Sequence, residues 1–161
     1  MLDFTQYLAG PSATRILADL GADVIKIERT PSGDLGRKIH LVDHGQSAFF
    51  IAACAGKKSV CVEIKHPKGK EIVYELVRQA DVVVENYSPG VMARLGLDYD
   101  TLKELNPKLI MCSVSGYGQD GPYAERPGYD FMAQAISGFM SVTGPIDGEP
   151  QRAGIAIADL S

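Results

Sequence analysis

A single carboxylate near the end of the sequence has the type and the surroundings that suggest chemistry. Asp159 follows the small and apolar run Gly154–Ala158 and precedes Leu160. A carboxylate buried among such residues must be paired or put to use, because an unpaired charge is costly to remove from water. We therefore expect Asp159 to be catalytic, and a helix N-cap is its alternative role, since Asp is a favoured capping residue.

Two polar turns that contain glycine follow predicted strands and form a second place where ligand chemistry is expected. Asn86–Gly90 follows a valine-rich stretch, and Ser115–Tyr123 follows the apolar stretch Lys108–Val114. Open α/β sheets bind ligands at the carboxyl ends of their strands, where such turns lie. We expect these turns to line a binding site.

These groups need a scaffold, and the sequence predicts one of alternating strands and helices. Apolar and β-branched runs mark five strands, at residues 2–4, 24–28, 60–64, 81–86 and 108–114. Apolar residues at helical spacing mark the helices, at residues 13–20, 47–55, 67–80, 101–105 and 131–140. The alternation predicts an α/β fold, a Rossmann-like parallel sheet with flanking helices and right-handed crossovers. The order of the strands in the sheet is left open.

Three local interpretations follow from spacing. Thr101 and Glu104 have the pattern of a capping box at a helix start. The last helix is expected to end at Gly144, and we interpret its apolar face as core: Phe131, Met132, Ala135, Ile136, Phe139 and Met140. The cysteines lack C-x-x-C spacing and lie in apolar surroundings, so we expect reduced core thiols: Cys54, Cys61 and Cys112.

Composition and charge argue against several classes of function. The chain has 161 residues and a net charge of -4 with interspersed signs, which disfavours nucleic acid or an anionic membrane as a partner. The longest apolar stretch, residues 49–55, is too short to cross a bilayer, and the N-terminus lacks an export pattern. Neither a G-x-G-x-x-G fingerprint after the first strand nor a P-loop is present, so an NAD enzyme is disfavoured. We expect one domain in the cytoplasm, or in the mitochondrial matrix of a eukaryote.

No metal site is expected from the histidines. The spacing of His40, His44 and His66 matches no common set of ligands. All three lie in polar or loop-like sequence, where a solvated histidine is the ordinary state.

Motifs spread over the whole sequence are weak singly and specific together. They are Leu2-Asp-Phe-Thr5, Leu8-Ala-Gly-Pro11, Leu20-Gly-Ala-Asp-Val-Ile-Lys-Ile-Glu-Arg29, Val84-Glu-Asn-Tyr-Ser-Pro-Gly90, Asn106-Pro-Lys-Leu-Ile110, Ser115-Gly-Tyr-Gly-Gln-Asp-Gly-Pro122 and Ala158-Asp159. In this order they resemble the class III CoA-transferases, the carnitine dehydratase and bile-acid-inducible protein family. Members of that family are considerably longer. The resemblance implies that residues 1–161 are a CoA-binding Rossmann-like domain, truncated just past the family's catalytic aspartate, here Asp159.

The resemblance implies transfer of coenzyme A from an acyl-CoA to a small carboxylic acid. In that chemistry Asp159 would attack the thioester carbonyl to form an acyl anhydride. The thiolate would return to give an aspartyl-CoA thioester, which the acceptor carboxylate opens. Aspartate is ionised at neutral pH and needs no general base for this attack. CoA and acyl-CoA are substrates, no permanently bound cofactor is implied, and the family forms interlocked homodimers.

The residues that would contact CoA follow from the family's motifs. Arg29 and Arg94 would bind phosphate or adenine, because a guanidinium offers phosphate a planar two-point fork; a solvated surface charge is their alternative. Asn86 and Tyr87 would contact adenosine and pantetheine. Further contacts would be Leu8, Ala9, Ser88, Pro127, Gly128, Tyr129 and Asp130, with Val62, Glu63, Ile64 and Lys65 lining the adenine pocket. The lysines of residues 57–70 would form a solvated face or steer CoA by charge.

Two positions separate this chain from branches of the family. The racemase branch has an acid/base histidine where this chain has Tyr129, and tyrosine is a poor replacement, so a 2-methylacyl-CoA racemase is disfavoured. Formyl-CoA transferases have glutamine where this chain has Leu8, which implies a larger or less polar acyl group. A noncatalytic fragment that only binds CoA or a nucleotide is the remaining alternative.

Overall fold

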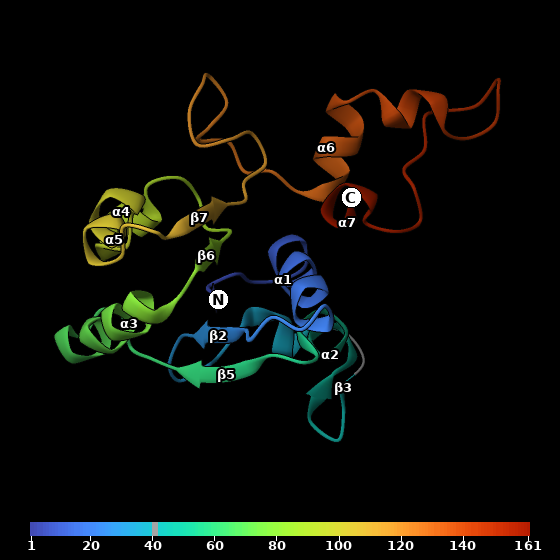
Figure 1. The fold of residues 1–161 in the computed structure, drawn as a ribbon. Coiled ribbons are helices and arrows are strands. Elements are labelled where there is room, and N and C mark those ends of the chain that lie inside the picture. Colours follow the sequence, from blue (N-terminus) through green and yellow to red (C-terminus); the bar gives the residue numbers. More distant parts are fainter. Residues whose placement is uncertain (40–41) are drawn as a thin grey trace. The chain divides into compact units, whose positions relative to one another are not determined.

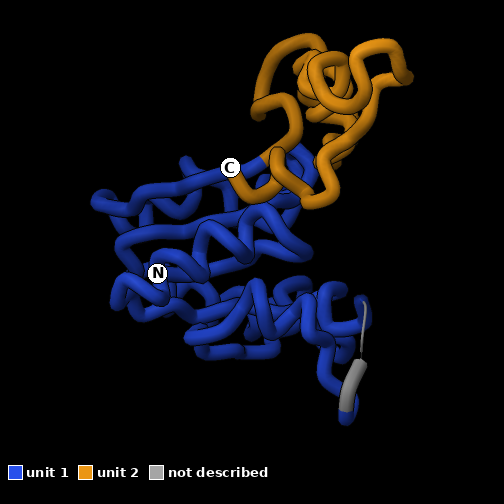
Figure 2. The backbone as a smooth tube through the Cα atoms, turned by 90° about the vertical axis from the view of Figure 1, so that its right-hand side faces the viewer, with its two compact units in different colours: residues 1–114 blue, residues 115–161 orange. Residues whose placement is uncertain are grey.

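A five-stranded parallel sheet forms the centre of the first of two units into which the chain divides, residues 1–114 and 115–161 (Figure 2). The computed structural model describes residues 1–39 and 42–161. The strands are β1 (Leu2–Asp3), β2 (Ile25–Glu28), β5 (Lys58–Cys61), β6 (Val82–Glu85) and β7 (Ile110–Ser113). All neighbouring strands are parallel. The predicted α/β fold with a parallel sheet is confirmed.

The strand order, which sequence reasoning left open, follows the Rossmann pattern. The strands lie in the order β5-β2-β1-β6-β7, which corresponds to the first five strands of the doubly wound order 3-2-1-4-5-6. The order reverses between β1 and β6, where Leu2 pairs with Val83 and Asp3 with Val84. Sheets of this kind bind their ligands at the carboxyl side of that reversal.

Helices connect the strands and cover both faces of the sheet. In the first unit they are α1 (Ala9–Asp19), α2 (Ala48–Cys54), α3 (Pro67–Gln79), α4 (Val91–Leu95) and α5 (Tyr99–Leu105), with a 3-10 helix η1 (Leu35–Lys38) and a hairpin of β3 (Val42–Asp43) and β4 (Gln46–Ser47). Figure 1 shows α3, α4 and α5 on one side of the sheet and α1 and α2 on the other. Pro67 begins α3 as predicted, because its missing N–H is not needed in a first turn.

The two faces of the sheet bury different kinds of side chain. The face toward α3, α4 and α5 is an apolar core that includes Leu2, Ile27 and Val83. Successive side chains of a strand point to opposite faces, so Asp3 and Lys26 point toward the other face, where both are buried. Charged side chains therefore occupy the interior beside α1, where Asp3 and Lys26 each form a buried ion pair.

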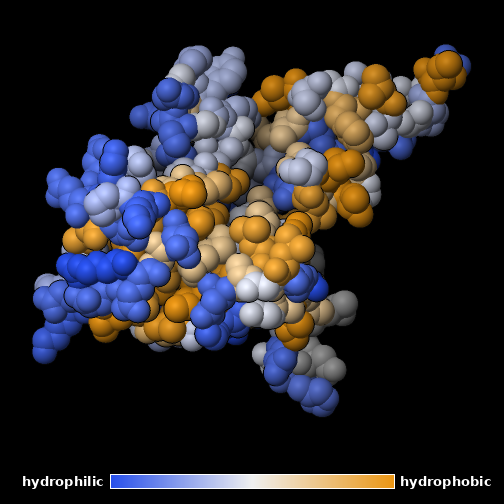
Figure 3. All heavy atoms as spheres, in the orientation of Figure 1, coloured by the Kyte–Doolittle hydropathy of each residue, from blue (hydrophilic) through white to orange (hydrophobic). Residues whose placement is uncertain are grey.

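Some large apolar side chains stay at the surface of the chain. The buried side of α1 consists of Gly10, Pro11 and Thr14. The apolar residues on its other side, Ile16 and Leu17, are exposed, and so are Leu20 after α1 and Ile51 of α2. Figure 3 shows apolar residues at the surface of both units. Among the described residues, no helix has the length and apolar character that a bilayer crossing requires.

Two of the three cysteines correct the prediction of core thiols. Cys54 is buried, as expected, but Cys61 and Cys112 are exposed. Cys61 lies on β5 and Cys112 on β7, the two edge strands of the sheet. An edge strand has a neighbour on one side only, so its residues gain less cover than those of a central strand.

The start of α5 also differs from its prediction. Asp98 is the N-cap residue, and its carboxylate accepts the backbone N–H of Thr101 at 3.1 Å and the Thr101 hydroxyl at 3.0 Å. The capping box with Thr101 as the cap is therefore wrong. A carboxylate is the stronger acceptor because its hydrogen bonds are charge-assisted.

The second unit holds α6 (Asp130–Ile136), a 3-10 helix η2 (Phe139–Val142) and α7 (Ile157–Leu160). The predicted long helix is interrupted because Gly138 takes a left-handed conformation, with φ of 81°. Phe131 and Ile136 are 55% and 61% exposed, whereas Gln134 is 1% exposed. The interpretation of the apolar face as core is wrong within this chain, and α6 turns a polar side chain inward.

Candidate functional site

Asn86 joins the ends of β1 and β6 at the point where the strand order reverses. The backbone N–H of Gln6 donates to Asn86 Oδ1 at 2.7 Å, and Asn86 Nδ2 donates to the Gln6 carbonyl oxygen at 2.8 Å. Gln6 Nε2 lies 3.4 Å from the Tyr87 hydroxyl. Burial raises the pKa of Tyr87, so its phenol is neutral at physiological pH. The structure brings the predicted Asn86 and Tyr87 together and adds Gln6, which sequence reasoning missed although it follows the first motif.

The backbone turns sharply between β1 and α1. Tyr7 has a φ of 65°, a left-handed conformation that costs a non-glycine residue about 1–3 kcal/mol. Leu8 is the N-cap residue of α1 and Ala9 is its first residue. A Cβ on Gly10 would lie 2.4 Å from Thr5 Cγ2, so glycine is required for the helix to approach the strand end. This approach holds Leu8 and Ala9, two predicted CoA contacts, beside the carboxyl end of β1.

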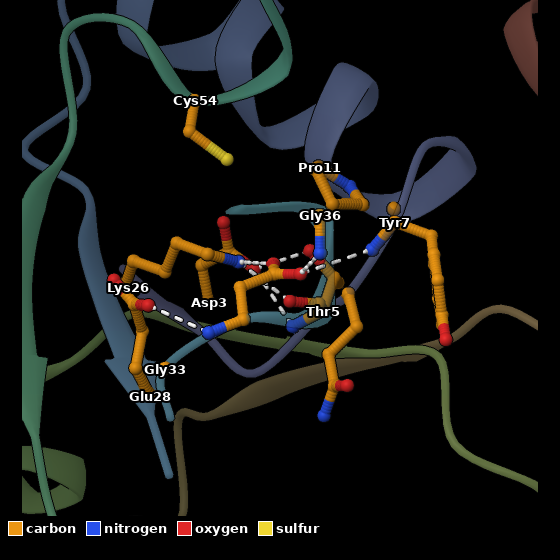
Figure 4. A network of polar contacts seen from close by, with 12 residues as sticks. Asp3, Thr5, Tyr7, Pro11, Lys26, Glu28, Gly33, Gly36 and Cys54 are labelled. Atoms are coloured by element: carbon orange, nitrogen blue, oxygen red, sulfur yellow. Dashed lines mark hydrogen bonds and ion pairs between the residues drawn. The ribbon is translucent and has the colours of Figure 1, made fainter. Parts of the chain in front are cut away.

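A cluster of buried charges lies beside this turn (Figure 4). Lys57 Nζ lies 2.9 Å from Asp3 Oδ2, and the two side chains are 1% and 0% exposed. Lys57 Nζ also donates to the Thr14 hydroxyl at 2.7 Å. Burial by itself raises the pKa of Asp3, but the charges of Lys26 and Lys57 outweigh it and hold that pKa below its usual value. The prediction of a solvated basic face is therefore wrong for Lys57, whose partner is 54 residues away in sequence.

Lys26 forms the second half of the cluster. Its Nζ lies 2.8 Å from Asp34 Oδ2 and donates to the Thr5 carbonyl oxygen at 2.6 Å. Asp34 Oδ1 accepts the Gly36 N–H at 2.7 Å. Burial favours the neutral amine, but Asp3 and Asp34 reverse this effect and raise the pKa of Lys26. The cluster therefore ties the loop after β2 to the turn after β1.

The loop after β2 carries two arginines with different partners, Arg29 and Arg37. Arg29 is exposed, and its Nε donates to Ser32 Oγ at 2.9 Å. Glu28 accepts two hydrogen bonds from Arg37, at 2.7 Å from Nε and 2.6 Å from Nη2. Burial raises the pKa of Glu28, but Arg37 and Ser59 outweigh it and lower that pKa to about 2. Arg37 is committed to Glu28, and the Arg29 side chain remains accessible to a ligand.

The segment of residues 62–65 precedes α3 and borders an open cavity. Val62 is buried in the apolar core, and Ile64 packs partly against it. Glu63 accepts the Thr30 hydroxyl at 3.1 Å. A cavity of about 290 Å³ is lined by Lys65, Pro67, Lys70, Glu71 and Tyr74. Of the predicted adenine-pocket residues, Lys65 is the one that lines this cavity, and the Val62 side chain faces away from solvent.

The turn after β6 leads into α4 and carries two more predicted contacts. Ser88 is exposed, and so is Arg94 on α4. A Cβ on Gly90 would lie 3.2 Å from Arg94 Nη1, so the guanidinium lies over this turn. Gly90 has a φ of 81°, a conformation that glycine adopts without strain. The Arg94 guanidinium therefore lies beside the turn that begins with Asn86 and Tyr87.

Asp159 lies in the second unit, within the first turn of α7. The N-cap residue is Ala156, so the alternative role of Asp159 as the cap is wrong. The backbone N–H of Ala158 donates to Asp130 Oδ1 at 2.8 Å. Asp159 is half-buried, and burial, followed by the charge of Asp130, raises the pKa of its carboxyl group. Two carboxylates, on α6 and α7, are thus electrostatically coupled.

The predicted motif of residues 127–130 leads into α6. A Cβ on Gly128 would lie 2.4 Å from the Cα of Gly116, so the two backbones approach as closely as only glycines allow. Tyr129 is 65% exposed, and its carbonyl oxygen accepts the N–H groups of Met132 and Ala133. Pro127 is exposed as well. Asp130 is the member of this motif that reaches α7.

The histidines have no common site in the part of the chain that the structure describes. No group of three or more His, Cys, Asp or Glu side chains is placed there to hold a metal ion. His66 caps α3, because its Nδ1 accepts the Lys68 N–H at 3.2 Å. His40 lies outside the described residues.

Comparisons with known proteins agree with one another. A family model described as CoA-transferase family III matches residues 1–161. The sequence is 46% identical over 167 residues to the succinate–glutarate CoA-transferase of Agrobacterium fabrum, and 48% identical over 162 residues to the succinyl-CoA:glutarate CoA-transferase of Homo sapiens. These matches cover 99% and 100% of this chain, which spans 42% and 37% of those proteins. A crystal structure of a CaiB/BaiF family protein from Brucella suis is 46% identical, with a TM-score of 0.93 over 99% of this chain and 43% of that one.

Proposed function

Because the chain belongs to CoA-transferase family III, we propose that this protein transfers coenzyme A from an acyl-CoA to a carboxylic acid, with Asp159 as the nucleophile. The observation that carries the proposal is the half-buried carboxylate of Asp159 in the first turn of α7. It is not the helix cap, and among the hydrogen bonds of the described residues its carboxylate accepts none. Its raised pKa, caused by burial and then by Asp130, makes it more basic and more nucleophilic than an exposed aspartate.

The proposed steps balance without a net proton transfer. A carboxylate oxygen of Asp159 attacks the thioester carbonyl. The C–S bond breaks, CoA leaves as a thiolate, and the acyl group remains on Asp159 as an anhydride. The thiolate attacks the aspartyl carbonyl of this anhydride, which releases the donor carboxylate and leaves an aspartyl-CoA thioester. The acceptor carboxylate attacks that thioester and expels the thiolate again. The thiolate attacks the acceptor carbonyl of the second anhydride, which yields the new acyl-CoA and frees Asp159.

We assign CoA recognition to the first unit. Asn86 and Tyr87 lie at the carboxyl side of the strand reversal, the part of such a sheet that binds nucleotides. The exposed guanidinium groups of Arg29 and Arg94 suit the CoA phosphates. The cavity beside Lys65 offers apolar and cationic surface for the adenosine end.

We propose short dicarboxylic acids as the acids that are exchanged. Two relatives carry the names of succinate and glutarate CoA-transferases, and this chain is 46% and 48% identical to them. Leu8 at the start of α1 argues for an acyl group larger or less polar than formyl. Tyr129 argues against the racemase, because that branch has an acid/base histidine at this position.

Family membership supports four further proposals. We propose that residues 1–161 belong to one CoA-binding Rossmann-like domain, that the protein is a homodimer, and that it holds no cofactor between turnovers. We place it in the cytoplasm, or in the mitochondrial matrix of a eukaryote. Sedimentation equilibrium tests the homodimer, and a mass equal to one chain would overturn it.

The test of the proposed function is covalent trapping. The product of the complete gene is incubated with succinyl-CoA in the absence of an acceptor acid, and the adduct is mapped by mass spectrometry. We expect an adduct on Asp159 that Asp159→Ala abolishes. The control is Asp147→Ala, because Asp147 is an exposed aspartate of the same unit, and it should keep the adduct. Unchanged turnover in Asp159→Ala would sink the proposal.

A further inference from the structure

Gln134 is a buried polar side chain in the middle of α6. It is 1% exposed, whereas its neighbours Ala133 and Ala135 are exposed. A buried carboxamide without partners destabilises a fold, because its hydrogen bonds to water are lost. Gln134 therefore needs hydrogen-bond partners for both ends of its carboxamide.

The carboxamide has one partner on its own helix and one on a distant segment. Gln134 Nε2 donates to Asp130 Oδ2 at 2.6 Å, and Gln134 Oε1 accepts the backbone N–H of Ala153 at 2.8 Å. Asp130 Oδ1 in turn accepts the N–H of Ala158 at 2.8 Å. Gln134 and Asp130 thus bind the N–H groups of Ala153 and Ala158, which lie on either side of residues 154–157. Ala158 directly precedes Asp159.

The helix that carries Asp159 needs such support. The N-cap residue of α7, Ala156, provides no side-chain hydrogen bond. The first N–H groups of any helix have no partner within that helix, so they need acceptors from elsewhere. Asp130 supplies the acceptor that the cap lacks, together with a negative charge that a helix N-terminus favours. The hydrogen bond from Gln134 Nε2 fixes the rotation of the Asp130 carboxylate, so that its other oxygen can accept the Ala158 N–H.

We propose that Gln134 is a positioning residue for the Asp159 nucleophile, acting through the Asp130 carboxylate and the Ala153 N–H. This inference rests on the function proposed above. Gln134 does not touch the substrate in this scheme; it sets the direction in which α7 presents Asp159. A nucleophile displaced by about 1 Å loses about a hundredfold in rate, so loosening this support is expected to slow attack while leaving CoA binding in the first unit intact.

Three variants separate positioning from simple packing. Gln134→Leu keeps a side chain of similar size and removes both hydrogen bonds. Gln134→Asn keeps the carboxamide but shortens its reach by one methylene. Gln151→Leu is the matched control, because Gln151 is an exposed glutamine of the same unit.

The experiment measures three quantities on the product of the complete gene. They are the single-turnover rate of adduct formation on Asp159 from succinyl-CoA, the CoA dissociation constant, and amide hydrogen exchange of the peptide covering residues 153–161. For Gln134→Leu we expect a rate about tenfold to a hundredfold lower, an unchanged dissociation constant and faster exchange. Gln151→Leu should match the wild type in all three.

The outcomes distinguish this inference from the proposed function. An adduct that forms equally fast in Gln134→Leu and the wild type overturns the positioning role and leaves the proposed function standing. If the wild type forms no adduct, the proposed function fails, and unchanged exchange in Gln134→Leu then overturns the positioning role as well. If Gln134→Leu does not fold, Gln134→Asn decides: a slower rate at an unchanged melting temperature supports positioning, and an equal rate overturns it.

Discussion

Two adjacent lysines should differ sharply in their contribution to stability. Lys57 and Asp3 form an ion pair at 2.9 Å with side chains that are 1% and 0% exposed. Lys58 pairs with Asp23 at 2.8 Å, but those side chains are 69% and 67% exposed. Removing one member of a buried pair leaves an uncompensated charge and costs about 3–5 kcal/mol. Because Asp3 keeps Lys26 nearby, we expect Lys57→Met to cost about 3 kcal/mol, the lower end of that range.

Urea unfolding followed by far-UV circular dichroism measures this difference. With a slope of about 2 kcal/mol per molar urea, Lys57→Met should lower the midpoint by about 1.5 M. Lys58→Met should leave the midpoint unchanged, because exposed ion pairs contribute little. The double variant Asp3→Asn with Lys57→Met should regain part of the loss, since no charge then stays buried alone. Equal midpoints for Lys57→Met and Lys58→Met would refute the assignment of a buried ion pair.

Two further predictions concern the loop after β2 and the CoA phosphates. The pKa of Glu28 is lowered from 4.5 to about 2, so its pairing with Arg37 stabilises the fold fully above about pH 4.5 and is lost as the pH falls toward about 2. In urea titrations, the free energy of unfolding of Glu28→Gln should fall less steeply than that of the wild type as the pH is lowered from about 4.5 to about 2. An equally steep fall would contradict the pairing. Arg29→Ala and Arg94→Ala should each weaken CoA binding about tenfold, the loss of one charge-assisted contact, in calorimetric titrations. Arg78→Ala, an exposed arginine on α3, is the control, and an equal affinity for all three variants would rule out the phosphate role.

The fold class was accessible from sequence because its signals are local. The valine run of β6 predicts a strand buried on both faces, and Val83 and Val84 are 0% and 5% exposed. Pro67 predicts the start of α3 for a reason contained in one residue, its missing N–H. Asn86 was expected in a turn after a strand, and it directly follows β6. Strand ends and turns can be predicted because their signals lie within a few residues.

Predictions that depended on distant neighbours were less successful. Cys61 and Cys112 were expected in the core, and they are exposed because β5 and β7 are edge strands, a property of the strand order. Lys57 was expected on a solvated face, but it forms a buried ion pair with Asp3, which lies on β1. The face of α6 was read from apolar spacing, but Gln134 is the residue that turns inward, toward Ala153.

The sequence by itself predicted five strands that alternate with helices, although the third lies at Lys58–Cys61 and not at residues 60–64. It also contains the family motifs and the aspartate in an apolar run, Asp159. These follow from periodicity and backbone preferences within a few neighbouring residues. Only the tertiary structure decided the strand order, the burial of Lys57 and the link from Gln134 through Asp130 to α7. Each of these depends on contacts between segments that are distant in the sequence. Burial and ion pairing arise from such contacts and cannot be inferred from a single stretch of chain.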